Sequence, residues 1–156
     1  MKTTGLRVAA ALAVAAGLAT GASGQDHEDH EDSGAPEQGY SLKDAPFHVQ
    51  LTMECRFATE CREDEPCAES GYGVTLNGDA GGLDEGAMVV SVVMSSETGD
   101  TEIVGVRDAG AMSLSGGSFD ARHLLTVAPD GTARYTVHYS DGPQVVSYLG
   151  RCEAEE

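Results

Sequence analysis

The stretch from Phe47 to Phe57 constrains the fold more than any other part of the chain. Apolar and polar residues alternate throughout it, and the apolar positions are Val49, Leu51, Met53, Cys55 and Phe57. A period of two is typical of a β-strand with one buried face and one solvated face. Cys55 falls on the buried face, so we expect its sulfur partner to reach the same interior from another strand.

Further short strands follow, separated by turns rich in glycine, proline, asparagine and aspartate. The strands expected from alternation or short apolar runs are residues 72–76, 88–94, 101–107, 111–115, 124–128, 132–139 and 144–152. The clearest hairpin turns at Pro129-Asp130-Gly131, where proline fixes one φ and Gly131 supplies a positive one. The pattern predicts an all-β fold, a small antiparallel meander of about seven or eight strands forming a barrel or sandwich.

Two of these regions carry sharper expectations. MVVSVVM, residues 88–94, is apolar on both faces except at Ser91, which predicts a strand covered on both sides. Residues 77–86 are rich in glycine and predict a turn that opens at Asn77-Gly78-Asp79. Oxygen ligands between Asn77 and Glu85 could hold calcium, but they lack the spacing of known calcium loops, and an ordinary flexible turn is the favoured interpretation.

The first 24 residues have the pattern of a secretory signal peptide. Lys2 and Arg7 give a basic start, residues 8–16 are an alanine-rich apolar run, and Ala22-Ser23-Gly24 is a small-residue cleavage site. A buried alanine-rich helix of the domain is the alternative. Because the run is too short to span a bilayer permanently, we expect an exported protein, periplasmic or secreted, with no membrane span after processing.

The acidic balance of the chain narrows the class of partner. Cleavage after Gly24 would leave 132 residues with seven basic and 26 acidic side chains, a net charge of −19. Nucleic acids and anionic membrane surfaces repel such a chain. Cations or a basic protein are the favoured partners, although solubility outside the cell explains the same charge.

The rest of the chain is expected to hold one domain between two acidic tails. Residues 25–45 lack hydrophobic periodicity and contain acids, glycine and proline, so we expect disorder there. The β domain is expected at residues 46–152, followed by a short acidic C-terminal tail at residues 153–156.

The N-terminal tail holds the best candidates for metal ligands. Asp26, His27 and His30 offer carboxylate and imidazole groups suited to Cu, Ni or Zn. If Gln25 became the N-terminus, its amine, two backbone amides and the His27 imidazole would form a square-planar nitrogen site for Cu(II) or Ni(II). A solvated acidic tail without metal is the alternative.

The four cysteines are expected to form two disulfides. Four cysteines permit three pairings, and we predict Cys61 with Cys67 inside one loop and Cys55 with Cys152 between the first and last strands. Cys55 and Cys152 each share a side with apolar residues, and closing a meander makes its first and last strands neighbours. Redox pairs and zinc sites favour shorter spacings than those found here, and the acidic surroundings would raise a thiol pKa and oppose reactivity.

The cysteine segments resemble those of a group of small exported bacterial β-proteins with four cysteines, to which no activity is attached. The likeness covers residues 47–152 and depends on residues 55–61 (CRFATEC), the acidic loop that closes at Cys67, and residues 147–152 (SYLGRC). The chain is more loosely similar to the periplasmic C-type lysozyme inhibitors, which insert a serine-containing loop and a basic side chain into lysozyme. In that likeness residues 115–118 (SGGS) stand for the loop, and no site residue is carried over.

The sequence favours a non-enzymatic binding or structural module whose ligand it does not name. A basic protein, such as a lysozyme-type hydrolase, is the favoured partner because opposite charge speeds encounter. Metal binding by the tail and an unrecognised hydrolase are the alternatives. The sequence contains no G-x-S-x-G, H-E-x-x-H or phosphate-binding glycine motif, so no catalytic residue is predicted, and His48, His123 and His138 are expected to face solvent from strands.

Overall fold

The computed structural model describes residues 41–142 and 144–155, and this part of the chain is all-β. Its one helical element is a 3₁₀ helix, η1 (Leu42–Asp44), and none of its helices is long and apolar enough to cross a membrane. Its strands are β1 (Phe47–Arg62), β2 (Ala68–Glu69), β3 (Gly73–Gly82), β4 (Ala87–Ser96), β5 (Gly99–Asp108), β6 (Ala111–Gly117), β7 (Ala121–Val127), β8 (Thr132–Tyr139) and β9 (Gln144–Ala154).

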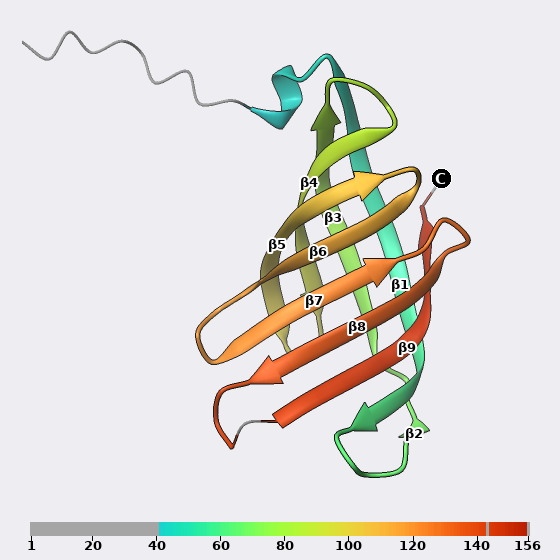
Figure 1. The fold of residues 1–156 in the computed structure, drawn as a ribbon, viewed down its shortest axis with the longest axis vertical. Helices are drawn as coiled ribbons and strands as arrows, with labels where there is room; N and C mark the ends of the chain where they lie inside the picture. Colours follow the sequence, from blue (N-terminus) through green and yellow to red (C-terminus); the bar gives the residue numbers. More distant parts are fainter. Residues whose placement is uncertain (1–40, 143, 156) are drawn as a thin grey trace, which may run out of the picture. The chain divides into compact units, whose positions relative to one another are not determined.

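Eight of these strands close into a barrel by antiparallel pairing, as Figure 1 shows. Each strand from β3 to β8 pairs with the next one in the chain, and β1 pairs with both β3 and β9. The two-residue strand β2 pairs with the far end of β1 as a short extra strand. Of the two architectures that the sequence left open, the structure is the meander barrel and not the sandwich.

The long strand β1 closes the barrel because its two halves pair with different neighbours. Residues 47–56 pair with β3, residues 53–62 pair with β9, and the register with β9 shifts between Phe57 and Thr59. Such a bulge bends its strand and increases the local twist. In Figure 1 the second half of β1 accordingly curves under one end of the barrel toward β2.

Both predicted disulfides are present. Cys55 lies directly opposite Cys152 in the β1–β9 register, and their Cα atoms are 3.9 Å apart. Cys61 and Cys67 close a short loop between β1 and β2, with Cα atoms 4.2 Å apart. The seam between the first and last barrel strands is therefore covalent. Disulfides of this kind are compatible with an oxidising compartment outside the cytosol.

The middle of the barrel is filled by side chains from the inner face of each strand. Buried and exposed residues alternate along β4 and β8 as the period of a strand requires. No polar or charged residue of the described chain is fully buried. The largest of the fully buried side chains are Tyr135, Phe57, Leu76, Ile103, Leu114, Leu125, Val90 and Cys55. An eight-stranded barrel is just wide enough to be filled in this way or to hold one small ligand.

The prediction that MVVSVVM is covered on both sides is wrong. Its even-numbered residues point into the barrel, but Val89 and Val93 lie on the outer face, as do Val104 and Val106 of β5, and all four are between 37% and 54% exposed. A closed barrel has one interior, and no layer of the described chain covers its outer face. These valines therefore reflect a preference for the pleated backbone and not burial.

The predicted turn at residues 77–86 is wrong in its first half. Strand β3 continues to Gly82, and only residues 83–86 leave the strands. A Cβ atom at Gly78 would lie 2.2 Å from the carbonyl oxygen of Ser91 in β4. Glycine here permits a close approach of two backbones inside the sheet and does not mark a turn.

Structure extends slightly beyond the expected β domain at both ends. Before β1, the Ser41 hydroxyl accepts a hydrogen bond from the Lys43 amide at the start of η1, and Ala45 is nearly buried. After Cys152, β9 continues to Ala154, and the amide of Glu155 donates to the carbonyl of Thr52. These contacts tie both flanks of the described chain to the barrel.

Candidate functional site

The two ends of the barrel interior are built from different side chains. One of them, here called the aromatic end, is filled by stacked rings, namely Phe57, Tyr72, His123, Tyr135 and Tyr148. The contacting pairs have ring centroids 4.7 to 6.1 Å apart, which is the range of favourable aromatic contact. Phe57 and Tyr135 are almost fully buried, so packed rings occupy this end.

Burial at the aromatic end favours the neutral forms of His123, Tyr135 and Tyr148. His123 Nδ1 and the Tyr135 hydroxyl lie 2.5 Å apart and share a hydrogen bond. Burial lowers the pKa of His123, and the neighbouring Arg122 guanidinium lowers it further. Burial raises the pKa of Tyr135 and raises that of Tyr148 to about 12. The prediction that His123 faces solvent is wrong, because its strand position places it on the inner face two residues before buried Leu125.

The opposite end of the barrel contains a cavity of about 720 Å³, here called the mouth pocket. It is bounded by the first half of β1, the β5–β6 and β7–β8 turns and the C-terminal end of β9, at the end of the barrel where Figure 1 marks the C-terminus. The apolar side chains that line it from the inner face are Val49, Leu51, Met53, Met112 and Val127. Its volume lies in the range of small-molecule sites.

Charged side chains occupy inward positions near both ends of the barrel. Within the described chain, they form an ion pair at the aromatic end but not at the mouth pocket. At the aromatic end, Glu60 pairs with Arg62, with the carboxylate oxygen 2.6 Å from Nε. At the mouth pocket, Arg107 lies opposite Met88 of β4 and Met112 of β6, both nearly buried, so it shares their inner face. No carboxylate among residues 41–142 and 144–155 lies within ion-pairing distance of the Arg107 guanidinium.

Other polar groups form the opposite side of the mouth rim. Arg151 Nη2 donates to the carbonyl oxygen of Asp130 at 2.5 Å. The Asp130 carboxylate accepts from the Thr132 amide at 2.8 Å, and that hydrogen bond lowers the pKa of Asp130. Glu153 and Glu155 complete this side of the rim.

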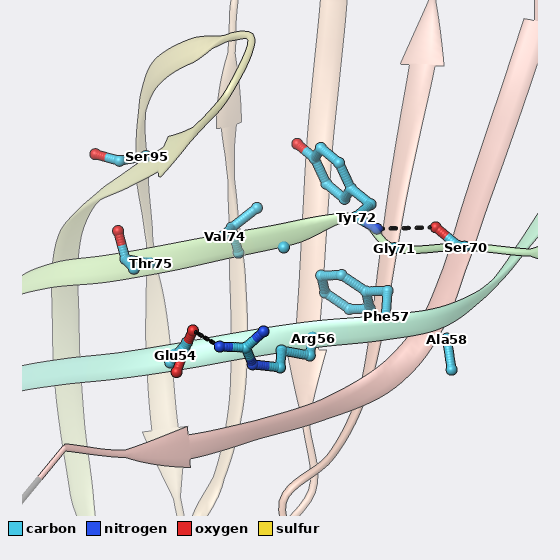
Figure 2. Close-up of a pocket in the computed structure, with 11 residues that line it drawn as sticks. Glu54, Arg56, Phe57, Ala58, Ser70, Gly71, Tyr72, Val74, Thr75 and Ser95 are labelled. Atoms are coloured by element: carbon cyan, nitrogen blue, oxygen red, sulfur yellow. Dashed lines mark hydrogen bonds and ion pairs between the residues drawn. The ribbon is translucent and has the colours of Figure 1, made fainter.

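A smaller cavity of about 380 Å³ lies where β1 and β3 separate beyond the Arg56–Gly73 pair. Figure 2 shows the rings of Phe57 and Tyr72 beside each other in this region, and the Glu54 carboxylate bonded to the Arg56 guanidinium at 2.6 Å. The charges that line this cavity therefore already have partners. Its rings belong to the aromatic end, and we assign it no ligand.

Residues 60–69 form an acidic lobe that the Cys61–Cys67 disulfide closes. The Glu63 carboxylate accepts a hydrogen bond from the Val145 amide at 3.0 Å, which anchors the lobe to the start of β9. The remaining carboxylates of the lobe belong to Glu60, Asp64, Glu65 and Glu69, and all but Glu60 are exposed. The lobe is therefore a tethered negative surface next to the aromatic end.

His48 and His138 are exposed, as predicted. His48 Nε2 lies 2.8 Å from Asp79 Oδ1, and Lys43 Nζ lies 3.9 Å from the other oxygen of the same carboxylate. A carboxylate–histidine pair is part of a hydrolytic triad, but no hydroxyl group of the described chain hydrogen-bonds the second ring nitrogen of His48. The pair is a hydrogen bond on the outer face of the sheet.

The candidate metal ligands Asp26, His27 and His30 lie outside the described residues. Metal binding by the tail and export through residues 1–24 therefore stay predictions. Within residues 41–142 and 144–155, no group of three or more histidine, cysteine, aspartate or glutamate side chains could hold a metal ion.

Two glycine-containing segments, residues 77–85 and residues 115–118, were candidates for a calcium-binding turn and for a serine-containing loop. In the structure, parts of both segments belong to strands. Asn77 and Asp79 lie within β3, and the Asp84 carboxylate accepts hydrogen bonds from the amides of Gly86 and Ala87. The oxygens of residues 77–85 are thus not gathered in one loop. Residues 115–118 form the end of β6 and the first residue after it.

Sequence reasoning missed the mouth pocket, although one signal was present. Arg107 has the parity of buried Ile103 and of Gly105, and not that of exposed Val104 and Val106. A basic residue in the apolar register near the end of a strand predicts a charge at the rim of the interior. Which other residues surround it depends on barrel closure, which the pattern of one strand does not reveal.

Comparison of the chain with models of protein families, with curated proteins and with solved structures gave no match.

Proposed function

We propose that this protein is an exported, disulfide-stabilised binding module that holds the apolar part of a small ligand in the mouth pocket. The observation that carries the proposal is the contrast within one barrel. Packed rings fill the aromatic end, whereas a concave cavity of about 720 Å³ stays open at the other end, with aliphatic and methionine side chains on its inner face and polar groups of comparable extent around them. A concave cavity that joins an apolar lining to placed polar groups is the usual form of a small-molecule site.

The composition of the lining supports a binding role. Methionine is flexible and polarisable and adapts to ligands of different shape, and Met53 and Met112 line the cavity from different strands. The Cys55–Cys152 disulfide lies in the adjacent wall, since Cys152 also lines the pocket. A covalent wall keeps the cavity open without requiring that a packed core fill it.

The test is a titration of the oxidised protein with N-phenyl-1-naphthylamine, a neutral probe that fluoresces in apolar sites. We expect saturable binding and displacement by decanol. Val49, 41% exposed at the rim, is replaced by tryptophan to fill the pocket, and Val49→Trp is expected to weaken probe binding at least about tenfold, the equivalent of about 1.4 kcal/mol.

Val104→Trp is the matched control. Val104 is a strand valine of similar exposure, but it lies on the outer face of β5. It should leave the affinity for the probe unchanged. Absence of saturable binding, or equal losses in the two variants, would remove the mouth pocket as the binding site.

A basic protein is the second candidate partner, and the acidic lobe is the observation that favours it. Asp64, Glu65 and Glu69 are exposed on a loop that a disulfide and the Glu63–Val145 hydrogen bond hold in place. Negative charge presented on a fixed surface speeds encounter with a basic partner. This candidate uses the other end of the molecule and is independent of the pocket.

The second candidate is tested by binding to an immobilised basic lysozyme while the salt concentration rises. The double variant Asp64→Asn/Glu65→Gln should weaken binding several-fold at low salt. The control Glu97→Gln/Asp100→Asn removes the same charge from the β4–β5 hairpin, at one turn residue and at the second residue of β5, and should have a smaller effect. Binding that is absent, or insensitive to salt, would count against a basic partner.

A further inference from the structure

We infer that the mouth pocket selects ligands that carry one anionic head group on an apolar chain, and that Arg107 binds the head group. This inference rests on the proposed function, because it names the class of ligand for the same pocket. It requires that Arg107 be available, that an anion be favoured at its side of the rim, and that the apolar lining be continuous with it.

Arg107 is available because the structure gives its charge no partner. Among the Lys and Arg residues of the described chain, Arg122 and Arg151 donate to carbonyl oxygens, and only Arg107 and Arg134 have neither an ion pair nor a side-chain hydrogen bond. Of these two, only Arg107 lines the mouth pocket. Lys43, Arg56 and Arg62 each pair with a carboxylate within 4.0 Å. Arg107 has no ion pair and no side-chain hydrogen bond to any other residue in the described parts of the chain.

The position of Arg107 joins the charge to the apolar lining. The residues opposite Arg107 on the two adjacent strands are Met88 and Met112, and both are buried on the inner face. A guanidinium half-buried among apolar groups interacts with an anion more strongly than one in bulk water. Its planar donor geometry matches a carboxylate, sulfate or phosphate with two parallel hydrogen bonds.

The polar residues around the pocket differ between its two sides. The side formed by β9 and the β7–β8 turn holds Asp130, Arg151, Glu153 and Glu155, and Arg151 already donates to the Asp130 carbonyl oxygen. Arg107 lies on the side formed by β5 and β6, and Asp108 beside it alternates to the outer face. Arg107 is therefore the basic side chain of the lining that has no hydrogen-bond or ion-pair partner in the described chain, and an anionic head group is expected on its side.

The experiment compares head groups on one alkyl chain. Decanoate, decyl sulfate, decanol and decyltrimethylammonium each displace N-phenyl-1-naphthylamine from the oxidised protein. We expect one of the two anions to bind about tenfold more tightly than decanol, and decyltrimethylammonium to bind no better than decanol. The ratio of decanoate to decyl sulfate affinity then identifies the preferred head group.

The variants separate a direct contact from the overall charge. Arg107→Gln should reduce the affinity for the preferred anion about tenfold and reduce the affinity for decanol much less. Arg134→Gln is the matched control, since Arg134 also lacks an ion pair in the described chain but lies exposed on the outer face of β8. It should change neither affinity. Arg107→Lys, which keeps the charge and loses the paired donors, should give an intermediate loss.

Each alternative result has a distinct meaning. Equal affinity of the wild-type protein for both anions and decanol overturns the role of Arg107 while the proposed pocket stands, and this comparison needs no variant that folds. Equal losses in Arg107→Gln and Arg134→Gln overturn the direct contact in favour of a general charge effect. Failure of every probe to bind overturns the proposed function and this inference together.

Discussion

The aromatic end and the mouth pocket lie at the two ends of the same barrel. They differ in the volume that their side chains leave open and in whether their charged groups are paired. At the aromatic end, five rings pack against one another and the rim charges of Glu60 and Arg62 pair at 2.6 Å. At the mouth pocket, smaller aliphatic side chains leave about 720 Å³ open, and no carboxylate of the described residues pairs with Arg107. One backbone topology therefore gives a packed end and an open end, and the side chains make the difference.

The difference shows that the two ends of a small barrel can contribute unequally to the stability of the fold. Large rings bury much area and pack with defined geometry, so the aromatic end stabilises the fold. A cavity forfeits the contacts that would fill it, so the mouth pocket contributes less to stability and must be supported by other means. The Cys55–Cys152 disulfide beside the pocket supplies that support, whereas Cys61–Cys67 closes only the lobe.

The largest effect should come from removing the seam disulfide. Cys55 and Cys152 are 97 positions apart, and in the chain-entropy model a crosslink of that span contributes about 4.7 kcal/mol. We expect Cys55→Ala/Cys152→Ala to lower the free energy of unfolding by about that amount, as measured by urea denaturation. The mouth probe should also bind more weakly, because the wall of the pocket loosens.

The lobe disulfide is the control for this prediction. Cys61 and Cys67 are six positions apart, so the same model gives about 2.4 kcal/mol. Cys61→Ala/Cys67→Ala should leave probe binding at the mouth unchanged. A larger loss of stability from the lobe disulfide than from the seam would contradict the assignment of structural support to the mouth side.

The next effect compares one side chain from each end. Tyr135 is almost fully buried in the ring cluster, so Tyr135→Ala should cost about 3–4 kcal/mol, as deletion of a buried aromatic does. Met53 is only partly buried at the mouth, so Met53→Ala should cost about 1 kcal/mol. Urea denaturation of both variants checks the ratio, and equal losses would mean that the mouth is packed as tightly as the aromatic end.

Much of the fold was predictable because local patterns and barrel geometry agree. The alternation around Cys55, the parity of Cys152 and the turn at Gly131, which has a φ of +83°, each depend on a few neighbouring residues. Closure then follows from pairing of the first and last strands, and with it the seam disulfide. The predictions about Val89 and Val93 failed because apolar residues do not reveal whether a second layer exists to cover them.

The candidate site was harder to predict because it is made by contacts between distant strands. Arg107, Met53 and Val127 come from three strands, and no spacing in the sequence links them. His123 was misplaced for a related reason. His123 shares the inner face of β7 with Leu125 and Val127, but the apolar Leu124 on the outer face hides this alternation in the sequence.

The smallest effect concerns the protonation of His123 at the aromatic end, and the pH dependence of the free energy of unfolding measures it. The pKa of His123 is lowered by burial in the folded protein, so between the unfolded value of about 6.5 and the folded value the unfolded chain binds more protons. This contribution to stability is complete above pH 6.5 and is lost as the pH falls. In urea denaturation between pH 7 and 5, His123→Gln should therefore lose less stability than the wild-type protein.

Two controls should keep the wild-type dependence of stability on pH. They are His138→Gln, which alters an exposed histidine, and Arg107→Gln at the opposite end. If His123→Gln keeps that dependence too, the aromatic end does not exclude charge, and the contrast between the two ends reduces to volume alone.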